Sequence, residues 1–240
     1  MPRSLVTRGK WPGLVVLRSG WSLAQARPWN DDLEGATLRV DRGNTPFLKS
    51  CTQWLLLEGA PAVTSVPLHR SARGMWEDAG FKVFRQLKLM ERDLSARCGQ
   101  VVHPVRVGSK ADLEDIFQID QESFEVEWRI GHLGLKDAME ATPRSRILML
   151  DDPDPVGFSV LGIAGSVAYL QRLAVLPDKR GLGYGRSLVR SGILWARERG
   201  AYTMILNTQT DNETSTALYQ SEGFELLPDH LHLVRYSRHR

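Results

Sequence analysis

The 240-residue sequence contains only two cysteines, Cys51 and Cys98, and neither has the spacing of metal ligands or of a disulfide framework. Two isolated thiols fit a reducing compartment. No apolar run approaches the roughly 20 residues that a membrane-spanning helix needs. The early run GLVVL is too short for the core of a signal peptide. We therefore expect a cytoplasmic protein with no membrane partner and no bound metal.

The sequence also lacks a large excess of either charge. Lysine and arginine total 31 against 28 aspartate and glutamate residues, which gives a net charge of +3. This balance permits attraction to phosphates or acidic peptides but does not require nucleic acid. The basic C-terminal run VRYSRHR has few aromatic residues and no groove-reading motif, so we do not expect a nucleic-acid partner.

A weak internal repeat links the two halves of the chain. The segment FLKSCTQWLLLEGA (47–60) aligns with LVRSGILWARERGA (188–201), and SARGMWEDAGFKV (71–83) aligns with TSTALYQSEGFEL (214–226). Both blocks occur in the same order, at shifts of 141 and 143 residues. This agreement indicates an internal duplication.

The second half predicts a complete mixed α/β unit, and the first half only the later part of one. We expect a boundary near DLSARCGQ, with segments 1–98 and 101–240. The predicted elements of the second half are a strand and a helix within 103–124, strands at 145–150, 155–165 and 166–175, a helix at 185–199 ending at Gly200, a strand at 202–206, a helix from the N-cap Asn212 to about residue 222, and two strands, FELL and HLHLVRYS, joined by a turn at PD.

The stretch LAVLPDKRGLGYGRSLV (173–189) predicts a strand, a glycine-rich turn and a helix. Backbone amides and the positive end of a helix dipole converge on an anion in such a turn. The P-loop is excluded because its Gly-Lys-Ser/Thr ending is absent. The dinucleotide fingerprint is excluded because its third glycine should follow the second by three positions, whereas the spacing here is two.

The Arg-x-x-Gly-x-Gly pattern of Arg180, Gly183 and Gly185, followed 27 residues later by NETSTALYQSEGF, resembles the GCN5-related N-acetyltransferase (GNAT) superfamily. The resemblance covers roughly residues 101–240. It implies a tandem GNAT fold of class α/β (mixed α+β), with a partial N-terminal unit before a complete C-terminal GNAT domain. It also implies acetyl-CoA as co-substrate and an amine as acceptor.

The resemblance assigns roles to particular residues. The cofactor would contact Leu173, Ala174, Val175, Arg180, Gly181, Leu182, Gly183, Tyr184, Gly185, Arg186, Asn212 and Tyr219. Strand residues 173–175 would meet the pantetheine arm, and the loop from Arg180 to Arg186 would cradle the pyrophosphate through its backbone amides. The Leu173 amide would stabilise the oxyanion, and the Tyr219 hydroxyl would protonate the departing thiolate as catalytic acid.

The general base is where the sequence departs from the family. The C-terminal half is most similar to the branch that acetylates ribosomal-protein alanine, yet the usual base positions hold amides, Asn207 and Gln171. Glu122, Glu125, Glu127 and His132 are candidates for the general base only because they lie on or just after the first predicted helix of this half. Trp128 is a candidate for lining an acceptor pocket.

The first half lacks the counterpart of the glycine series around VDRGNTPFL (40–48), and Trp76 replaces the tyrosine. It is therefore interpreted as a degenerate copy, in an arrangement similar to mycothiol synthase. We expect an N-acetyltransferase acting on a peptide N-terminus, amino acid or small metabolite. Alternatives are a small-thiol-precursor acetyltransferase of mycothiol-synthase type and a non-catalytic acyl-CoA sensor or scaffold, and a homodimer stays open.

Overall fold

The computed structural model describes residues 4–30 and 33–237, which form two compact units. The first unit comprises residues 1–87 and 229–240, and the second comprises residues 88–228. Each unit has its own hydrophobic core. Within the described ranges, no helix combines the length and the apolar character needed to cross a membrane. The last three residues of the basic tail VRYSRHR lie outside the described residues.

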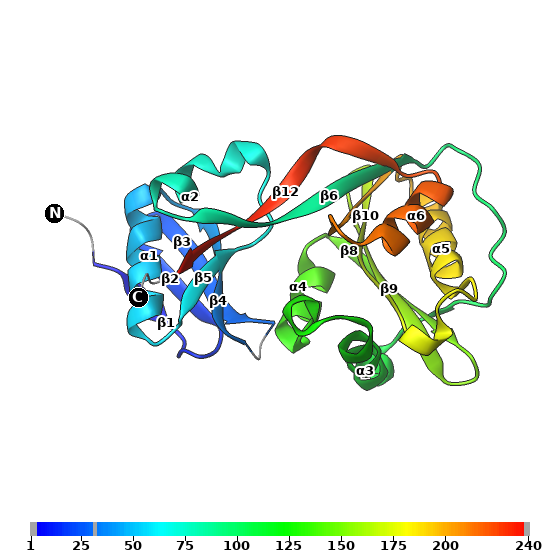
Figure 1. The fold of residues 1–240 in the computed structure, drawn as a ribbon, viewed down its shortest axis with the longest axis horizontal. Helices are drawn as coiled ribbons and strands as arrows, with labels where there is room; N and C mark the ends of the chain where they lie inside the picture. Colours follow the sequence, from blue (N-terminus) through cyan, green and yellow to red (C-terminus); the bar gives the residue numbers. More distant parts are fainter. Residues whose placement is uncertain (1–3, 31–32, 238–240) are drawn as a thin grey trace. The chain divides into compact units, whose positions relative to one another are not determined.

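The first unit packs short helices against a mostly antiparallel sheet with the strand order β1-β2-β3-β4-β5-β12 (Figure 1). Strand β5 runs parallel to β4, and residues 235–237 of β12 pair antiparallel with β5. The elements are β1 (Val6–Arg8), β2 (Val15–Ser19), β3 (Ser22–Trp29), β4 (Leu33–Arg42), α1 (Thr45–Leu57), β5 (Ala62–Ser65), a 3-10 turn (Arg70–Ala72), α2 (Gly74–Asp78), the start of β6 (Lys82–Asp93) and the end of β12 (Glu225–Ser237).

Helix α1 shows how local sequence forms this unit. Asn44 caps the helix by accepting a hydrogen bond from the Phe47 amide at 3.0 Å. Its buried apolar face includes Leu48, Cys51 and Leu55, which belong to the core of the first unit. Burial raises the pKa of the Cys51 thiol to about 12, so this cysteine is an inert packing residue.

The second unit is a sheet with the strand order β6-β11-β10-β9-β8-β7 and helices on both faces (Figure 1). Alternate residues of β8 face opposite cores, with Leu148 and Leu150 beside α5 and Ile147 and Met149 beside α3 and α4. The elements are β7 (Arg106–Val107), α3 (Leu113–Ser123), α4 (His132–Glu140), β8 (Arg144–Asp151), β9 (Pro155–Ala164), β10 (Val167–Val175), α5 (Tyr184–Glu198), β11 (Thr203–Gln209), α6 (Glu213–Ser221) and 3-10 turns at Lys110–Asp112, Val126–Trp128 and Pro177–Lys179.

Most predicted elements of this unit are confirmed. Helix α5 ends before Gly200, whose φ of 78° suits the residue after a helix C-cap. Helix α6 begins after Asn212, whose side chain accepts a hydrogen bond from the Ser215 amide at 3.0 Å. The residues around both helix ends therefore act as the sequence predicts.

The prediction of two C-terminal strands joined by a turn at PD is wrong. The structure has one continuous strand, β12, which runs from Glu225 to Ser237 through Pro228. Partners hold it extended, because Leu68 bridges His232 and the last residues pair with β5. Tertiary pairing thus overrides the local turn tendency.

The compact units do not have the boundaries of the predicted segments 1–98 and 101–240. The structure divides the chain within β6, between residues 87 and 88, and the C-terminal strand joins the first unit. Strand β3 pairs with both β2 and β4 in the first sheet. The division into two acetyltransferase-like segments remains a prediction.

Candidate functional site

Two parallel strands of the second unit separate at the site. Strand β10 pairs with β11 only from Val167 to Leu170, opposite Thr203 to Leu206. The β10 register against β9 then shifts between Leu170 and Arg172, as expected at a β-bulge. Beyond the bulge, β10 keeps its pairing with β9 alone and opens on its other side toward a cavity.

The open edge of β10 presents backbone groups to this cavity. The Leu176 amide donates to the Val156 carbonyl of β9 at 2.9 Å, whereas the Val175 carbonyl accepts from Ser123 Oγ at 3.1 Å and from Arg180 Nε at 3.2 Å. Backbone groups of successive strand residues alternate between the two edges. The amide and carbonyl of Leu173 therefore face the opening.

The three alternating glycines of the loop serve different purposes. Gly181 and Gly183 have φ values of 80° and 88°, in the left-handed region that side chains disfavour. Gly183 is the N-cap of α5 and has no side chain to occupy the first amides of the helix. Gly185 lies inside the first turn, where an added Cβ would lie 3.3 Å from Leu218 of α6. The loop thus leaves a helix N-terminus open and lets α6 pack closely.

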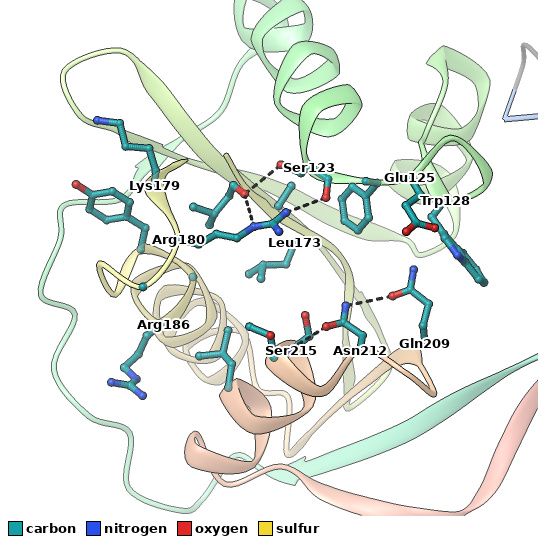
Figure 2. Close-up of a pocket in the computed structure, with 18 of the residues that line it drawn as sticks. Ser123, Glu125, Trp128, Leu173, Lys179, Arg180, Arg186, Gln209, Asn212 and Ser215 are labelled. Carbon is teal, nitrogen blue, oxygen red and sulfur yellow. Dashed lines mark hydrogen bonds between the residues drawn. The ribbon is translucent and has the colours of Figure 1, made fainter. Parts of the chain in front are cut away.

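The cavity between these elements measures about 670 Å³. Figure 2 shows Lys179 and Arg186 on one side and Glu125, Trp128 and Gln209 on the other. The lining residues are Ser123, Phe124, Glu125, Trp128, Leu173, Ala174, Val175, Lys179, Arg180, Gly181, Gly183, Tyr184, Gly185, Arg186, Gln209, Asp211, Asn212, Thr214, Ser215 and Leu218.

The cations around the glycine loop are held by specific partners. Lys179 lies 3.3 Å from Asp152, and hydrogen bonds from Tyr184 and then Lys179 hold the pKa of that carboxyl below its usual value. Arg186 pairs with the buried Glu222 at 2.9 Å. Lys179 and Arg186 thus line one end of the cavity, each paired with a carboxylate.

Arg180 turns its side chain toward protein carbonyls. Its Nη2 donates to the Ser123 carbonyl at 2.8 Å, in addition to the bond from Nε to Val175 (Figure 2). The guanidinium therefore links the loop to the ends of β10 and α3. The role of the backbone amides as most of the anion site stays a prediction.

A buried ion pair lies on the other side of β10. Asp120 is fully buried and lies 2.6 Å from Arg172, and its other oxygen accepts from the Ile130 amide at 2.7 Å. Arg172 also donates to the Trp128 carbonyl at 2.7 Å, and its guanidinium lies 3.6 Å from the centre of the Phe124 ring. This network fixes the segment 124–130 against β10.

The structure brings most of the predicted cofactor residues into one cavity. Leu182 and Tyr219 are not among the lining residues. Leu182 is 54% exposed, and its carbonyl lies 2.9 Å from His103 Nε2. Tyr219 packs in the core under α6, where burial raises the pKa of its hydroxyl to about 12. Its hydroxyl therefore carries its proton at neutral pH.

Only some of the residues predicted for base or acceptor roles line the cavity. Glu125 and Trp128 line the cavity, whereas Gln171, Asn207, Glu122, Glu127 and His132 do not. The His132 ring stacks on Phe117 with 3.8 Å between ring centres. The cavity lining also includes Gln209, Asp211 and Ser215, which were not predicted but lie around the predicted N-cap Asn212. Among the described residues, no group of three His, Cys, Asp or Glu side chains could hold a metal ion.

Comparisons with known proteins define the class. Residues 113–224 match the sequence model of the acetyltransferase (GNAT) family. The solved structure of a tandem GNAT protein from the clavulanic acid biosynthesis pathway has a TM-score of 0.63, with 12% sequence identity over 99% of this chain and 84% of that chain. Both the family and the tandem GNAT fold expected from the sequence are confirmed.

Three curated proteins show the range of the family around this chain. The aminoglycoside N(6′)-acetyltransferase type 1 of Klebsiella aerogenes is 34% identical over 32% of this chain and 57% of its own length. The ribosomal protein bS18-alanine N-acetyltransferase of Haemophilus influenzae is 26% identical over 47% of this chain and 75% of its own. The mycothiol acetyltransferase of Kocuria rhizophila is 26% identical over 55% of this chain and 48% of its own. The chain thus spans about half to three quarters of these relatives.

Proposed function

We propose that this protein transfers an acetyl group from acetyl-CoA to a primary amine. One observation carries the proposal: the parallel strands β10 and β11 separate above a glycine loop that leaves the N-terminus of α5 open, and a 670 Å³ cavity joins the two features. An open strand edge and an open helix N-terminus match the two chemical parts of the coenzyme, an amide-containing arm and a pyrophosphate.

The residues present fit this co-substrate. The backbone groups of Leu173 can hydrogen-bond an extended amide chain as a neighbouring strand would. The amides of the loop from Arg180 to Arg186 and the dipole of the 15-residue helix α5 favour an anion, and Lys179 adds positive charge. Asn212 lines the cavity while its side chain caps α6, so contact and capping are compatible.

Acetyl-CoA supplies an acetyl group activated as a thioester. The Leu173 amide, which faces the opening, is suited to stabilise negative charge on the carbonyl oxygen during attack. The cavity walls hold amine and thioester together, which replaces an encounter in solution by a reaction between positioned groups. The protein's contribution is therefore orientation and charge stabilisation.

Tyr219 is proposed as the acid that protonates the leaving thiolate. Its raised pKa of about 12 keeps the hydroxyl protonated at neutral pH, and its position on α6 is one residue beyond Leu218, which lines the cavity. Because the side chain itself packs in the core, a small movement of α6 must expose the hydroxyl for this role.

The names of the curated relatives support a proposal for the chemical class of the acceptor. The names of the three curated proteins describe an aminoglycoside, the alanine of a ribosomal protein and mycothiol chemistry, and amine acetylation connects them. A mycothiol-type activity is a second candidate, favoured by the tandem fold. A non-catalytic acyl-CoA sensor remains the rival, because amides occupy the usual base positions 171 and 207.

Calorimetric titration with acetyl-CoA tests the site, with Gly183→Ala and Gly200→Ala as a matched pair. Both glycines have left-handed φ values and an added Cβ would make no close contact, so both variants carry a similar backbone cost of about 1–2 kcal/mol. Only Gly183 borders the cavity. We expect at least tenfold weaker binding for Gly183→Ala and unchanged binding for Gly200→Ala.

Turnover is then measured as release of free coenzyme thiol with a panel of primary amines. Equal affinities for wild type and Gly183→Ala would show that the loop is not the anion site. Tight binding of acetyl-CoA without thiol release for any amine would favour the sensor over the enzyme.

A further inference from the structure

The end of the cavity away from the glycine loop carries acidic and aromatic side chains (Figure 2). Glu125 and Trp128 lie there with Gln209, opposite Lys179 and Arg186. We propose that the Glu125 carboxylate binds the ammonium group of the acceptor and accepts its proton. We further propose that the acceptor is a cationic amine with no carboxylate beside its nitrogen. Both statements rest on the proposed acetyl transfer.

Geometry singles out Glu125 among the acidic residues. The amides Gln171 and Asn207 lie outside the cavity lining, so neither residue touches an acceptor held there. The only carboxylates among the described lining residues belong to Glu125 and Asp211. Asp211 directly precedes the N-cap of α6 and lies on a different element from Trp128. Glu125 follows α3 and is the N-cap of the 3-10 turn Val126–Trp128, so one turn places both Glu125 and Trp128 in the cavity lining.

The Glu125 carboxylate is available for a substrate. Within the part of the chain that the structure describes, no ion pair engages it, in contrast to Asp120, Asp152 and Glu222, which are held by arginine or lysine. A carboxylate that lines a cavity without a protein cation attracts a cationic ligand. A primary amine is protonated at neutral pH and therefore carries the positive charge that such a carboxylate attracts.

The segment that bears Glu125 is fixed in place before any ligand binds. The Trp128 amide donates to the Glu125 carbonyl at 2.8 Å, and Arg172 donates to the Trp128 carbonyl at 2.7 Å. The buried Asp120 holds both Arg172 and the Ile130 amide. A base that is held by such a network loses little entropy on binding its substrate.

Charge and shape define the substrate class. The indole of Trp128 can attract an ammonium group through a cation–π contact, and Asp211 adds a second negative charge to the lining. A carboxylate beside the reacting nitrogen would be repelled by both acidic groups. Free α-amino acids are therefore excluded from the predicted acceptors, and amines such as peptide N-termini, amino sugars or alkylamines remain.

The proton balance of the step is complete. The ammonium group gives one proton to Glu125 and becomes a neutral amine. The amine nitrogen then forms a bond to the acetyl carbon while the bond from that carbon to sulfur breaks. Tyr219 gives its proton to the departing sulfur and is reprotonated through water by the second proton that leaves the nitrogen, and Glu125 returns its own proton to water. The products are an amide, a free thiol and one proton.

The test compares Glu125→Gln with Glu122→Gln. Glu122 is an exposed residue of α3 outside the cavity lining, and it accepts a hydrogen bond from Gln118 at 3.1 Å. Its variant therefore makes the same chemical change away from the cavity. The measurements are acetyl-CoA affinity, phenethylamine affinity in the presence of CoA, and kcat/KM for phenethylamine and phenylalanine between pH 6 and 9. This pair of probes differs by one carboxylate beside the amine.

For Glu125→Gln we expect unchanged acetyl-CoA affinity, at least tenfold weaker phenethylamine binding, and a kcat/KM at pH 7 lower by about 10²–10⁴-fold. The deficit should shrink toward pH 9, where more of the free amine is already neutral. Glu122→Gln should match wild type, and wild type should prefer phenethylamine to phenylalanine.

Two results would overturn the inference while leaving acetyl transfer intact. One is a wild-type pH profile and amine affinity in Glu125→Gln, with the loss found instead in Asp211→Asn. The other is equal use of phenylalanine and phenethylamine by wild type. Failure of wild type to bind acetyl-CoA or to acetylate any amine would instead overturn the proposed function.

Discussion

Replacement of Asp120 by asparagine removes the negative charge of a buried ion pair while preserving the shape of the side chain. Asp120 has no exposed surface, and Arg172 is about 16% exposed. The asparagine oxygen can still accept from the Ile130 amide, but its NH₂ group would face the guanidinium, donor against donor. The variant therefore leaves a positive charge in the protein interior without its partner.

The expected cost is about 3–5 kcal/mol in the free energy of unfolding, which is typical when one member of a buried pair is removed. Domains are stable by about 5–15 kcal/mol, so the loss is a large share of the total. At a urea dependence of roughly 2 kcal/mol per molar, the unfolding midpoint should fall by about 1.5–2.5 M. Urea unfolding followed by circular dichroism measures this shift.

A double-mutant cycle identifies the cause. Asp120→Asn combined with Arg172→Met removes both charges, so the double variant should lose at least 1 kcal/mol less than the sum of the single losses. Glu140→Gln breaks the exposed Lys136–Glu140 pair in the same unit and should cost less than about 0.5 kcal/mol. A loss below 1 kcal/mol for Asp120→Asn, or additive losses in the cycle, would refute the argument.

Loss of the Asp120–Arg172 ion pair should also affect binding of the amine. The pair holds the backbone of the segment 124–130, so Asp120→Asn should raise the KM for the amine while leaving acetyl-CoA affinity within about twofold of wild type. The glycine loop on the other side of the cavity does not contact Asp120, and its own anchor is Arg180. Equal losses in both affinities would show that the whole unit, rather than this segment, is disturbed.

Three further predictions follow from individual contacts. Tyr219→Phe should keep acetyl-CoA affinity but lower kcat by about 10²–10⁴-fold in thiol-release assays, and full activity would remove its acid role. The Arg106 guanidinium lowers the pKa of Asp112 to about 2, below the unfolded value of roughly 3.9, so the stabilisation that this carboxylate contributes is present above pH 4 and lost toward pH 2. The difference in urea midpoint between wild type and Asp112→Asn should therefore shrink from pH 4 to pH 2. A constant difference would contradict this prediction. An added Cβ at Gly192 would lie 2.9 Å from the buried Leu161, so Gly192→Val should lower the unfolding free energy by about 1–3 kcal/mol in urea titrations, and a more stable variant would show that α5 can move off β9.

Much of the second unit follows from local sequence. The caps Asn212 and Gly200 mark helix ends that their own residue types favour, and the glycines at 181 and 183 have the left-handed φ values that their spacing suggests. Local signals also bring most of the predicted cofactor residues together, because a strand, a loop and a helix N-terminus that adjoin in sequence must adjoin in space. These predictions depend on interactions within a few residues.

Other features depend on contacts between distant parts of the chain. The turn predicted at Pro228 is replaced by the continuous strand β12, because pairing partners such as Leu68 lie far away in the sequence. Tyr219 occupies the expected sequence position, yet the packing of α6 turns its side chain into the core. Neither outcome can be inferred from nearby residues.

The sequence by itself determined the class of the domain, the conformation of the glycine loop and the amides at the usual base positions, because each follows from residue types at fixed spacing. Only the tertiary structure decided which of the candidate acidic residues lines the cavity. Glu122, Glu125 and Glu127 are equivalent in the sequence, and the hydrogen bonds of Asp120 and Arg172 to the segment 124–130 leave Glu125 alone among them in the cavity lining. The physical reason is that the position of a side chain at a cavity is set by long-range packing, while the conformation of a loop is set by its own residues.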